Sequence, residues 1–175
     1  YPGEKGGDAV ADVLFGDYNP SGKLPITFYR SVEDLPDFLD YTMKNRTYRY
    51  FNGNPLWHFG YGMSYTSFDF GKPKYKKGKL TVDVKNTGKV DGDEVVQVYI
   101  RRIDDTEGPK KSLKAFQRVS VKAGEKQTVC IDMPHESFEV WDAETNTMRV
   151  VPGKYEVMVG NSSRLEDLKT ITVKK

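Results

Sequence analysis

The stretch "KLTVDVKNTGKVDGDEVVQVYIR", Lys79–Arg101, alternates apolar and polar residues on both sides of a turn. Apolar side chains recur at every second position, first over Leu80–Val84 and again over Val96–Ile100. This is the period of a β-strand with one buried face. The intervening "NTGKVDGD" is rich in turn-forming Gly, Asn and Asp. The stretch therefore predicts two consecutive strands.

The same alternation continues to the end of the chain. Further runs place apolar residues at alternate positions: Val129, Ile131 and Met133; Tyr155, Val157 and Val159; Ile171 and Val173. The segments "KAGEK", "VPGK" and "GNSS" separate the runs as turns, and no helical pattern intervenes. Residues 68–175 are therefore predicted to form an antiparallel β-sandwich of about seven strands, with a domain boundary near Ser67.

Residues 1–67 have a different character and predict a partial α/β segment. Val10, Val13 and Leu14 have helical spacing, and Gly16 follows as a helix terminator, which predicts a short helix over residues 7–15. "DYNPSG" then predicts a turn, and "KLPITF" predicts a strand that Pro25 keeps near a sheet edge. Residues 30–47 are polar without a clear period and predict a long ordered loop.

Composition excludes several classes of function. The 27 basic and 25 acidic residues are spread along the 175-residue chain, so no nucleic-acid interface or polybasic membrane surface is indicated. No apolar run approaches the roughly 20 residues of a membrane span. The single Cys130 excludes an internal disulfide and a multi-cysteine metal site, and we expect it in a strand as a small apolar residue. The start at "YPGEKGG", without an initiator Met, suggests an excised fragment.

Few residues suggest chemistry. Glu4 is the most suggestive carboxylate, because its glycine-flanked loop before the first helix would allow close approach of a ligand. The favoured alternative is that Glu4 only caps that helix or faces water, as most charged residues do. His58 and His135 have no partners at metal-ligand or triad spacing, so no metal site, cofactor or hydrolase triad is expected. "GEKGG" lacks the Lys-Ser/Thr ending of a phosphate-binding loop. The acidic cluster of Asp104, Asp105 and Glu107 is expected to be a solvated loop.

The stretch "YRYFNGNPLWHFGYGMSYTSF", Tyr48–Phe68, contains nine rings, counting the imidazole of His58. Gly and Pro residues interrupt it, so neither a helix nor a long strand is expected there. Such rings could form a platform for a sugar or be buried where two domains meet. Burial is favoured, with Trp57 in the core of the contact. The predicted junction residues are Tyr48, Tyr50, Phe51, Trp57, Phe59, Tyr61 and Tyr65.

Two motifs, "PGEKGGDAVADVLFGDYNPSGKLPITF" and "RTYRYFNGNPLWHFGYGMSYTSF", resemble the C-terminal end of glycoside hydrolase family 3, which includes β-glucosidases and β-xylosidases. The remainder, including "VPGKYEVMVGNSS", is similar to the fibronectin type III-like (immunoglobulin-like) domain that follows the catalytic domains in many members. The resemblance implies a mainly β fold with two parts. Residues 1–67 would be the tail of the α/β sandwich domain with its linker, and residues 68–175 the fibronectin type III-like domain.

The resemblance also carries functional expectations. In the family, an upstream barrel supplies the nucleophilic Asp and the upstream α/β sandwich supplies the acid/base Glu, so no catalytic residue is expected in this chain. Its partners would be those two domains of the same polypeptide and, in the intact enzyme, an oligosaccharide substrate. Glu4 would lie on the active-site side as a second-layer residue. A periplasmic or secreted location is implied.

The implied reaction is retaining, exo-acting hydrolysis of terminal β-D-xylosyl or β-D-glucosyl residues of plant oligosaccharides. "LPDFLDYTMKNRTYRYF" looks more like the β-xylosidase branch. This fragment alone is expected to be inactive. The alternative from a different class is a stand-alone carbohydrate-binding or adhesive β-sandwich module.

Overall fold

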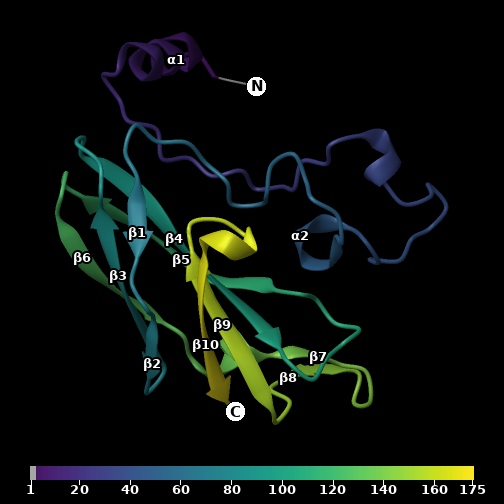
Figure 1. Ribbon diagram of the computed structural model, residues 1–175. Coiled ribbons are helices and arrows are strands. Elements are labelled where there is room, and N and C mark those ends of the chain that lie inside the picture. Colours follow the sequence, from purple (N-terminus) through teal and green to yellow (C-terminus); the bar gives the residue numbers. More distant parts are fainter. Residues whose placement is uncertain (1–2) are drawn as a thin grey trace.

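The computed structural model describes residues 3–175 as a mainly β molecule (Figure 1). Two four-stranded antiparallel sheets pack face to face, and a long N-terminal segment, residues 3–67, runs along one end of them. One sheet contains β1 (Phe68–Phe70), β2 (Lys74–Lys76), β3 (Lys79–Asn86) and β6 (Lys126–Asp132). The other contains, in order, β10 (Leu168–Lys174), β9 (Lys154–Gly160), β4 (Gly92–Arg102) and β5 (Ser112–Val121). A small hairpin, β7 (Val140–Asp142) with β8 (Thr147–Arg149), completes the β structure of the described chain.

The core lies between the two sheets and follows the period-two pattern. Along β3 the side chains of Leu80, Val82 and Val84 are at most 2% exposed, while β6 contributes Val129 and Ile131 at paired positions. Phe138, in the short helix η2 (His135–Phe138), fills one end of this core. Its ring makes edge contacts with Tyr75 and Tyr155, at centroid distances of 5.5 and 5.6 Å. The sandwich predicted from the alternation is confirmed.

Strand β4 departs from that pattern because it is buried on both faces. Val96, Val98 and Ile100 face the core, and the alternate positions Gln97 and Tyr99 are also at most 3% exposed. The outer face of β4 is covered by the N-terminal segment, since Gln97 Nε2 donates a hydrogen bond to the carbonyl oxygen of Gly60. The N-terminal segment is thus held against one specific strand.

The N-terminal segment contains little regular structure. Helix α1 spans Gly6–Phe15 and ends at Gly16, whose φ of 86° suits glycine, so the expected helix is present. The short helices η1 (Val32–Asp34) and α2 (Thr47–Tyr50) follow, and η3 (Leu165–Asp167) lies beyond β9. The expectation that the ring-rich stretch holds no helix is wrong for its first three residues, which belong to α2.

The strand expected at "KLPITF" is also wrong. Only an isolated bridge forms there, between Phe28 and Trp57. Backbone hydrogen bonds join Leu24 to Tyr61 and Gly60, but the ladder does not extend. Pro25 lacks an N–H group, and the partner strip contains glycine, so both sides lose the regularity that a strand needs.

Cys130 does lie in a strand, β6, but its side chain is exposed. Val129 and Ile131 on either side of it take the inward positions. Strand alternation therefore places Cys130 on the outer face of the sheet.

The sandwich should fold without the N-terminal segment, because its core side chains come from residues 68–175. We expect a polypeptide of residues 67–175 to melt in one cooperative transition, at a lower midpoint than the 175-residue chain, since the outer face of β4 is then exposed. Differential scanning calorimetry measures this directly. A gradual melt without a heat-absorption peak would show that the sandwich needs the segment in order to fold.

Candidate functional site

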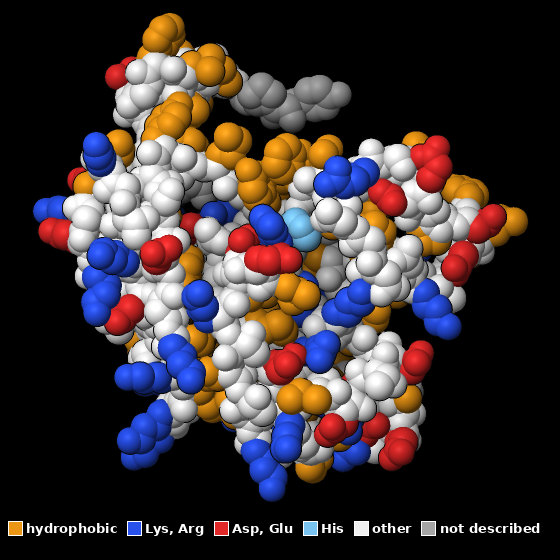
Figure 2. Space-filling model, in the orientation of Figure 1, with side chains coloured by type: hydrophobic (Ala, Val, Ile, Leu, Met, Phe, Trp, Pro, Cys, Tyr) orange, Lys and Arg blue, Asp and Glu red, His pale blue; other side chains and the backbone are white. Residues whose placement is uncertain are grey.

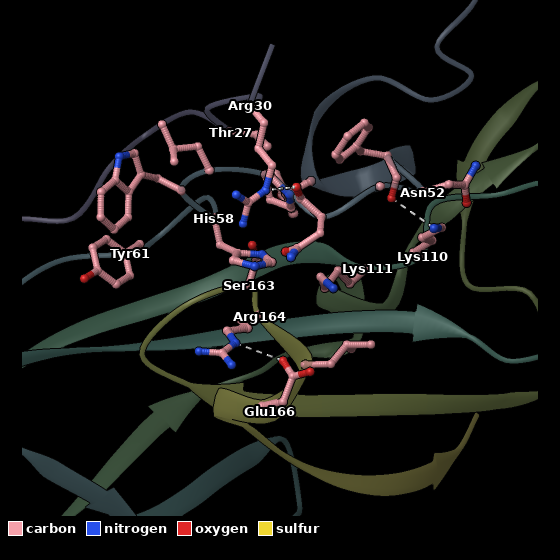
Figure 3. Close-up of a pocket in the computed structure, with 18 residues that line it drawn as sticks. Thr27, Arg30, Asn52, His58, Tyr61, Lys110, Lys111, Ser163, Arg164 and Glu166 are labelled. Atoms are coloured by element: carbon pink, nitrogen blue, oxygen red, sulfur yellow. Dashed lines mark hydrogen bonds and ion pairs between the residues drawn. The ribbon is translucent and has the colours of Figure 1, made fainter. Parts of the chain in front are cut away.

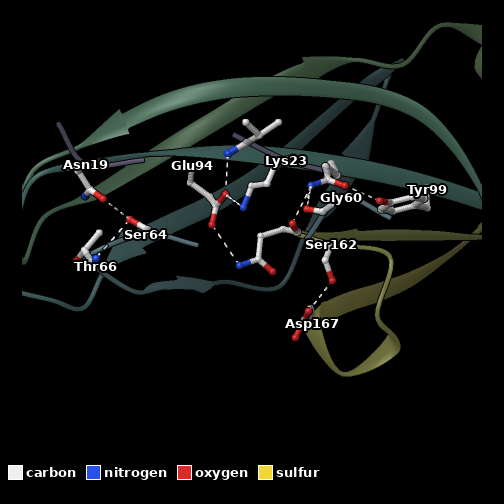
Figure 4. A network of polar contacts seen from close by, with 12 residues as sticks. Asn19, Lys23, Gly60, Ser64, Thr66, Glu94, Tyr99, Ser162 and Asp167 are labelled. Carbon is white, nitrogen blue, oxygen red and sulfur yellow. Dashed lines mark hydrogen bonds and ion pairs between the residues drawn. The ribbon is translucent and has the colours of Figure 1, made fainter. Parts of the chain in front are cut away.

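A buried ion pair joins the N-terminal segment to β4. Lys23 Nζ lies 2.6 Å from Glu94 Oε1, and the two side chains are only 14% and 4% exposed. The same Oε1 accepts a hydrogen bond from the backbone N–H of Val95, and Oε2 accepts one from Asn161 Nδ2 at 3.2 Å. Figure 4 shows the Lys23 side chain pointing toward the Glu94 carboxylate. The carboxylate is therefore compensated by one cation and two neutral donors, as a buried charge requires.

A second polar contact surrounds Gln97. Its Nε2 donates to the carbonyl oxygens of Gly60, at 3.0 Å, and Asn161, at 2.7 Å, and its Oε1 accepts from the Tyr99 hydroxyl at 2.5 Å. Gly60 has a φ of 78°, and a Cβ atom there would lie 2.0 Å from Gln97 Oε1. Only glycine allows this approach. Burial raises the pKa of Tyr99, so its hydroxyl stays protonated as the donor.

Two of the predicted junction rings, Tyr48 and Phe59, contact the sandwich through Tyr99. Tyr48 and Phe59 stack at 4.2 Å, and each meets Tyr99 edge-on, at 5.9 and 6.4 Å. The Tyr48 hydroxyl also accepts a hydrogen bond from the backbone N–H of Leu113 at 3.0 Å. Phe51 is buried, and its carbonyl oxygen accepts a hydrogen bond from Lys110 Nζ at 2.9 Å.

The other predicted junction rings contact mainly the N-terminal segment itself. Trp57 stacks on Tyr61 at 4.8 Å but is 40% exposed, so the expectation that Trp57 lies in a buried core does not hold in this chain. Tyr65 is 50% exposed and donates its hydroxyl hydrogen bond to the Val13 carbonyl oxygen of α1. Tyr50 is half-buried, with the Arg49 guanidinium over its ring.

Asn19 fastens the start of the segment and was missed from the sequence, where "NPSG" reads only as a turn. Its Oδ1 accepts hydrogen bonds from Ser64 Oγ and from the backbone N–H of Tyr65, at 2.9 and 2.8 Å. Its Nδ2 donates to the Asp91 carbonyl oxygen at 2.9 Å. One side chain thereby ties together three segments, and the Asn-Pro turn is the only sequence signal for it.

A pocket of about 700 Å³ opens between the N-terminal segment and the sandwich (Figure 3). Its lining residues come from three parts of the chain. The N-terminal segment contributes Thr27, Arg30, Tyr48, residues 51–58 and Tyr61. The sandwich contributes Lys110 and Lys111 from one connection between strands and Ser163, Arg164, Leu165 and Glu166 from another. The only carboxylate among these residues is Glu166, whose Oε2 lies 3.1 Å from Arg164 Nε.

Positive charge dominates the pocket and acts on its histidine. Burial, followed by the charges of Lys111 and Arg164, lowers the pKa of His58 below its ordinary value of 6.5. Lys111 is only 8% exposed, and burial together with Lys110 and Arg101 lowers its pKa as well. Neutral His58 is therefore the favoured form near pH 7.

The remaining sequence candidates lie outside these sites. Glu4 is exposed in the turn before α1 and does not line the pocket. Asp105 accepts a hydrogen bond from the Gly108 backbone N–H within its own loop, and His135 lies in η2. Among residues 3–175, no three His, Cys, Asp or Glu side chains gather as metal ligands, and no helix is both long and apolar enough to cross a membrane.

Comparison with known proteins gives two family-model matches. Residues 1–65 match the glycosyl hydrolase family 3 C-terminal domain, and residues 94–163 match the fibronectin type III-like domain. Together the two matches define a domain arrangement, a glycosyl hydrolase family 3 C-terminal segment followed by a fibronectin type III-like sandwich. The chain is similar to the C-terminal portion of glycoside hydrolase family 3 enzymes.

Individual relatives agree with this assignment. A xylan 1,4-beta-xylosidase from Xylanibacter ruminicola is 52% identical over 99% of this chain, and a periplasmic beta-glucosidase from Salmonella typhimurium is 39% identical over 93%. The chain spans only 21% and 24% of the lengths of these two relatives. The crystal structure of a Bifidobacterium adolescentis GH3 beta-glucosidase matches 98% of this chain with a TM-score of 0.86 and 32% identity, and the match spans 28% of that structure.

The buried ion pair yields a stability prediction. Lys23→Met leaves the Glu94 carboxylate buried without its cation, so we expect a loss of about 3 kcal/mol in the free energy of unfolding. The double variant Lys23→Met/Glu94→Gln should recover part of this loss, because no unpaired charge remains. Denaturant titration of the 175-residue chain measures both.

The matched control for that measurement is Lys79→Met. It breaks an exposed pair with Asp132, in which the side chains are 60% and 78% exposed, and should cost far less stability than Lys23→Met because water screens the pair. Equal losses in the free energy of unfolding for Lys23→Met and Lys79→Met would contradict the claim that burial makes the Lys23–Glu94 pair important.

The charges around His58 yield a pH prediction. In an NMR titration, the His58 ring protons should titrate below pH 6.5, and Lys111→Met should move the midpoint upward because one repelling charge is gone. Since the folded pKa is the lower one, the unfolded chain takes up this proton first as pH falls. His58 therefore contributes to the free energy of unfolding at neutral pH. That contribution falls as the pH drops from about 6.5, the unfolded value, to the lower pKa of the folded state. A His58 midpoint above 6.5 would refute the assignment.

Proposed function

We propose that this chain is the non-catalytic C-terminal part of a retaining, exo-acting β-glycosidase that releases terminal β-D-xylosyl residues, with β-D-glucosyl residues as the second choice. The observation that carries the proposal is the 52% identity to a xylan 1,4-beta-xylosidase over 99% of the chain. The β-glucosidase relatives, at 39% identity or less, support β-D-glucosides as the second candidate substrate class.

The exposed hydrophobic side chains of the N-terminal segment support the proposal that an upstream domain packs on it. Sixteen of the 21 exposed large hydrophobic side chains of the described chain lie before Ser67. Helix α1 buries none of its residues, and its Val10, Leu14 and Phe15 are 57%, 74% and 84% exposed. In Figure 2 hydrophobic side chains gather over α1 and along the edge of the molecule below it. An apolar surface of this kind marks a contact site.

The proposed cover for this surface is the upstream part of the α/β sandwich domain in the same polypeptide, preceded by the catalytic barrel. An amphipathic helix normally gains its stability by burying its apolar face. In this proposal the junction residues Tyr48, Tyr50, Phe51, Trp57, Phe59, Tyr61 and Tyr65 fasten the tail of that domain to the sandwich. The upstream part would then cover the exposed side chains of Trp57 and Tyr65.

The positions of the carboxylates support the proposal that this chain alone is inactive. Glycoside hydrolysis of this type needs two carboxyl groups about 5–5.5 Å apart on either side of the scissile bond. The pocket has a single carboxylate, Glu166, and its Arg164 partner lies beside it. Glu4 stands exposed outside that pocket. The catalytic pair would therefore belong to the upstream domains.

The proposal predicts a clear difference between two proteins. The intact polypeptide that contains this chain should hydrolyse an aryl β-D-xyloside with a higher kcat/KM than the aryl β-D-glucoside, whereas the 175-residue chain should hydrolyse neither. A chromogenic assay after repurification measures both. Turnover by the 175-residue chain that disappears in Glu4→Gln would overturn the proposal, and a higher kcat/KM on the glucoside would reassign the substrate.

The second candidate is a carbohydrate-binding module, favoured by the half-exposed Trp57–Tyr61 pair at the pocket. A neutral xylo-oligosaccharide would then raise the melting temperature of the 175-residue chain by mass action, and Trp57→Ala would abolish the shift. No shift is expected under the leading proposal.

A further inference from the structure

The pocket of Figure 3 has a composition that neither hydrolysis nor the junction explains. Basic side chains enter it from three separate parts of the chain: Arg30 from the N-terminal segment, Lys110 and Lys111 before β5, and Arg164 before η3. His58 adds an imidazole, and Glu166 is the one acidic side chain among the lining residues. The lining therefore carries an excess of positive charge.

Some of these cations have protein partners and one does not. Arg30 Nε donates to the Asn54 carbonyl oxygen at 3.0 Å, and Lys110 Nζ donates to the Phe51 carbonyl oxygen at 2.9 Å. Arg164 lies beside Glu166. Lys111, only 8% exposed, forms no ion pair within the described part of the chain. A buried ammonium without a counter-charge is costly unless an anion joins it.

Two hydroxyl groups at the pocket lack partners as well. Ser163 is 1% exposed, and its Oγ has no hydrogen-bond partner among residues 3–175, nor has Thr27 Oγ1. The backbone N–H of Ser163 donates to the Phe59 carbonyl oxygen at 2.9 Å, so the position of the residue is fixed. Figure 3 shows Ser163 beside His58, with Lys111 and Arg164 near them. Buried hydroxyl groups are normally hydrogen-bonded, and a ligand oxygen would satisfy this one.

We propose that this pocket is an oxyanion-binding site that takes a carboxylate or a phosphate group. The Lys111 ammonium supplies the counter-charge, and the Ser163 hydroxyl and the Arg164 guanidinium donate hydrogen bonds to the oxygens. The Trp57–Tyr61 pair beside these donors offers an apolar wall, which suits a sugar that carries a carboxylate.

The test is calorimetric titration of the intact polypeptide at low ionic strength with three probes. D-glucuronate and inorganic phosphate represent the two sources of the oxyanion, and D-glucose is the neutral control. We expect one or both anions to bind and glucose to bind at least tenfold more weakly. Tighter glucuronate binding assigns an acidic sugar, and tighter phosphate binding assigns a free anion. Absence of binding by both anions would overturn the proposal.

Variants assign the binding to these residues. Lys111→Met should weaken anion binding by roughly tenfold to a hundredfold, as loss of a charged hydrogen bond does. Ser163→Ala should weaken it several-fold without a change in melting temperature, because its Oγ bonds no described residue. The matched control is Lys114→Met, a part-buried lysine that donates to Glu139 outside the pocket and should leave affinity unchanged.

Anion binding that survives both Lys111→Met and Ser163→Ala would refute the site. If Lys111→Met fails to fold, Ser163→Ala decides. The proposal does not depend on the substrate of the enzyme, because binding is measured separately from turnover. Failure of the glycosidase assay would leave the anion titration valid, and the reverse also holds.

Discussion

The position of the whole N-terminal segment depends on the buried pair between Lys23 and Glu94. A carboxylate in the first half of β4 would be expensive to bury alone, and here it receives one ammonium and two N–H donors from three segments. Lys23 belongs to residues 3–67, whereas Asn161 follows β9. The energy of burying Glu94 is thereby offset only when the segment lies across β4, which makes the placement specific.

This constraint also explains which features the sequence could reveal. Alternation identifies strands through their inward side, so Leu80, Val96 and Val157 predict the sandwich correctly. Gln97 and Tyr99 occupy the alternate positions of β4, which the same rule assigns to solvent. Gly60 and Asn161 provide the acceptors that buried Gln97 needs, and Gln97 in turn accepts the hydrogen bond of the Tyr99 hydroxyl. No local pattern encodes those partners.

The errors in the N-terminal segment have a similar origin. "KLPITF" has strand-like composition, but its partner strip cannot continue a ladder, so a single bridge results. Trp57 has the size of a core residue, yet its neighbours within this chain, Tyr61 among them, leave it 40% exposed. The side of the segment toward the sandwich is held by polar bonds and by the Tyr48 and Phe59 rings, while large hydrophobic side chains stay exposed elsewhere on the segment. The proposed upstream domain would cover these exposed side chains.

The proposed anion site would link the junction to ligand binding. Arg30 and His58 belong to the N-terminal segment, while Lys111, Ser163 and Arg164 belong to the sandwich, so the full set of donors exists only when the two parts are docked. Bringing these cations together opposes docking by charge repulsion. Burial lowers the pKa of His58, and the charges of Lys111 and Arg164 lower it further. An anion that binds the assembled set would relieve the repulsion and favour the docked state by mass action. By reciprocity, tighter docking would raise the affinity for the anion, and the buried pair at Glu94 would act on the pocket without contacting it.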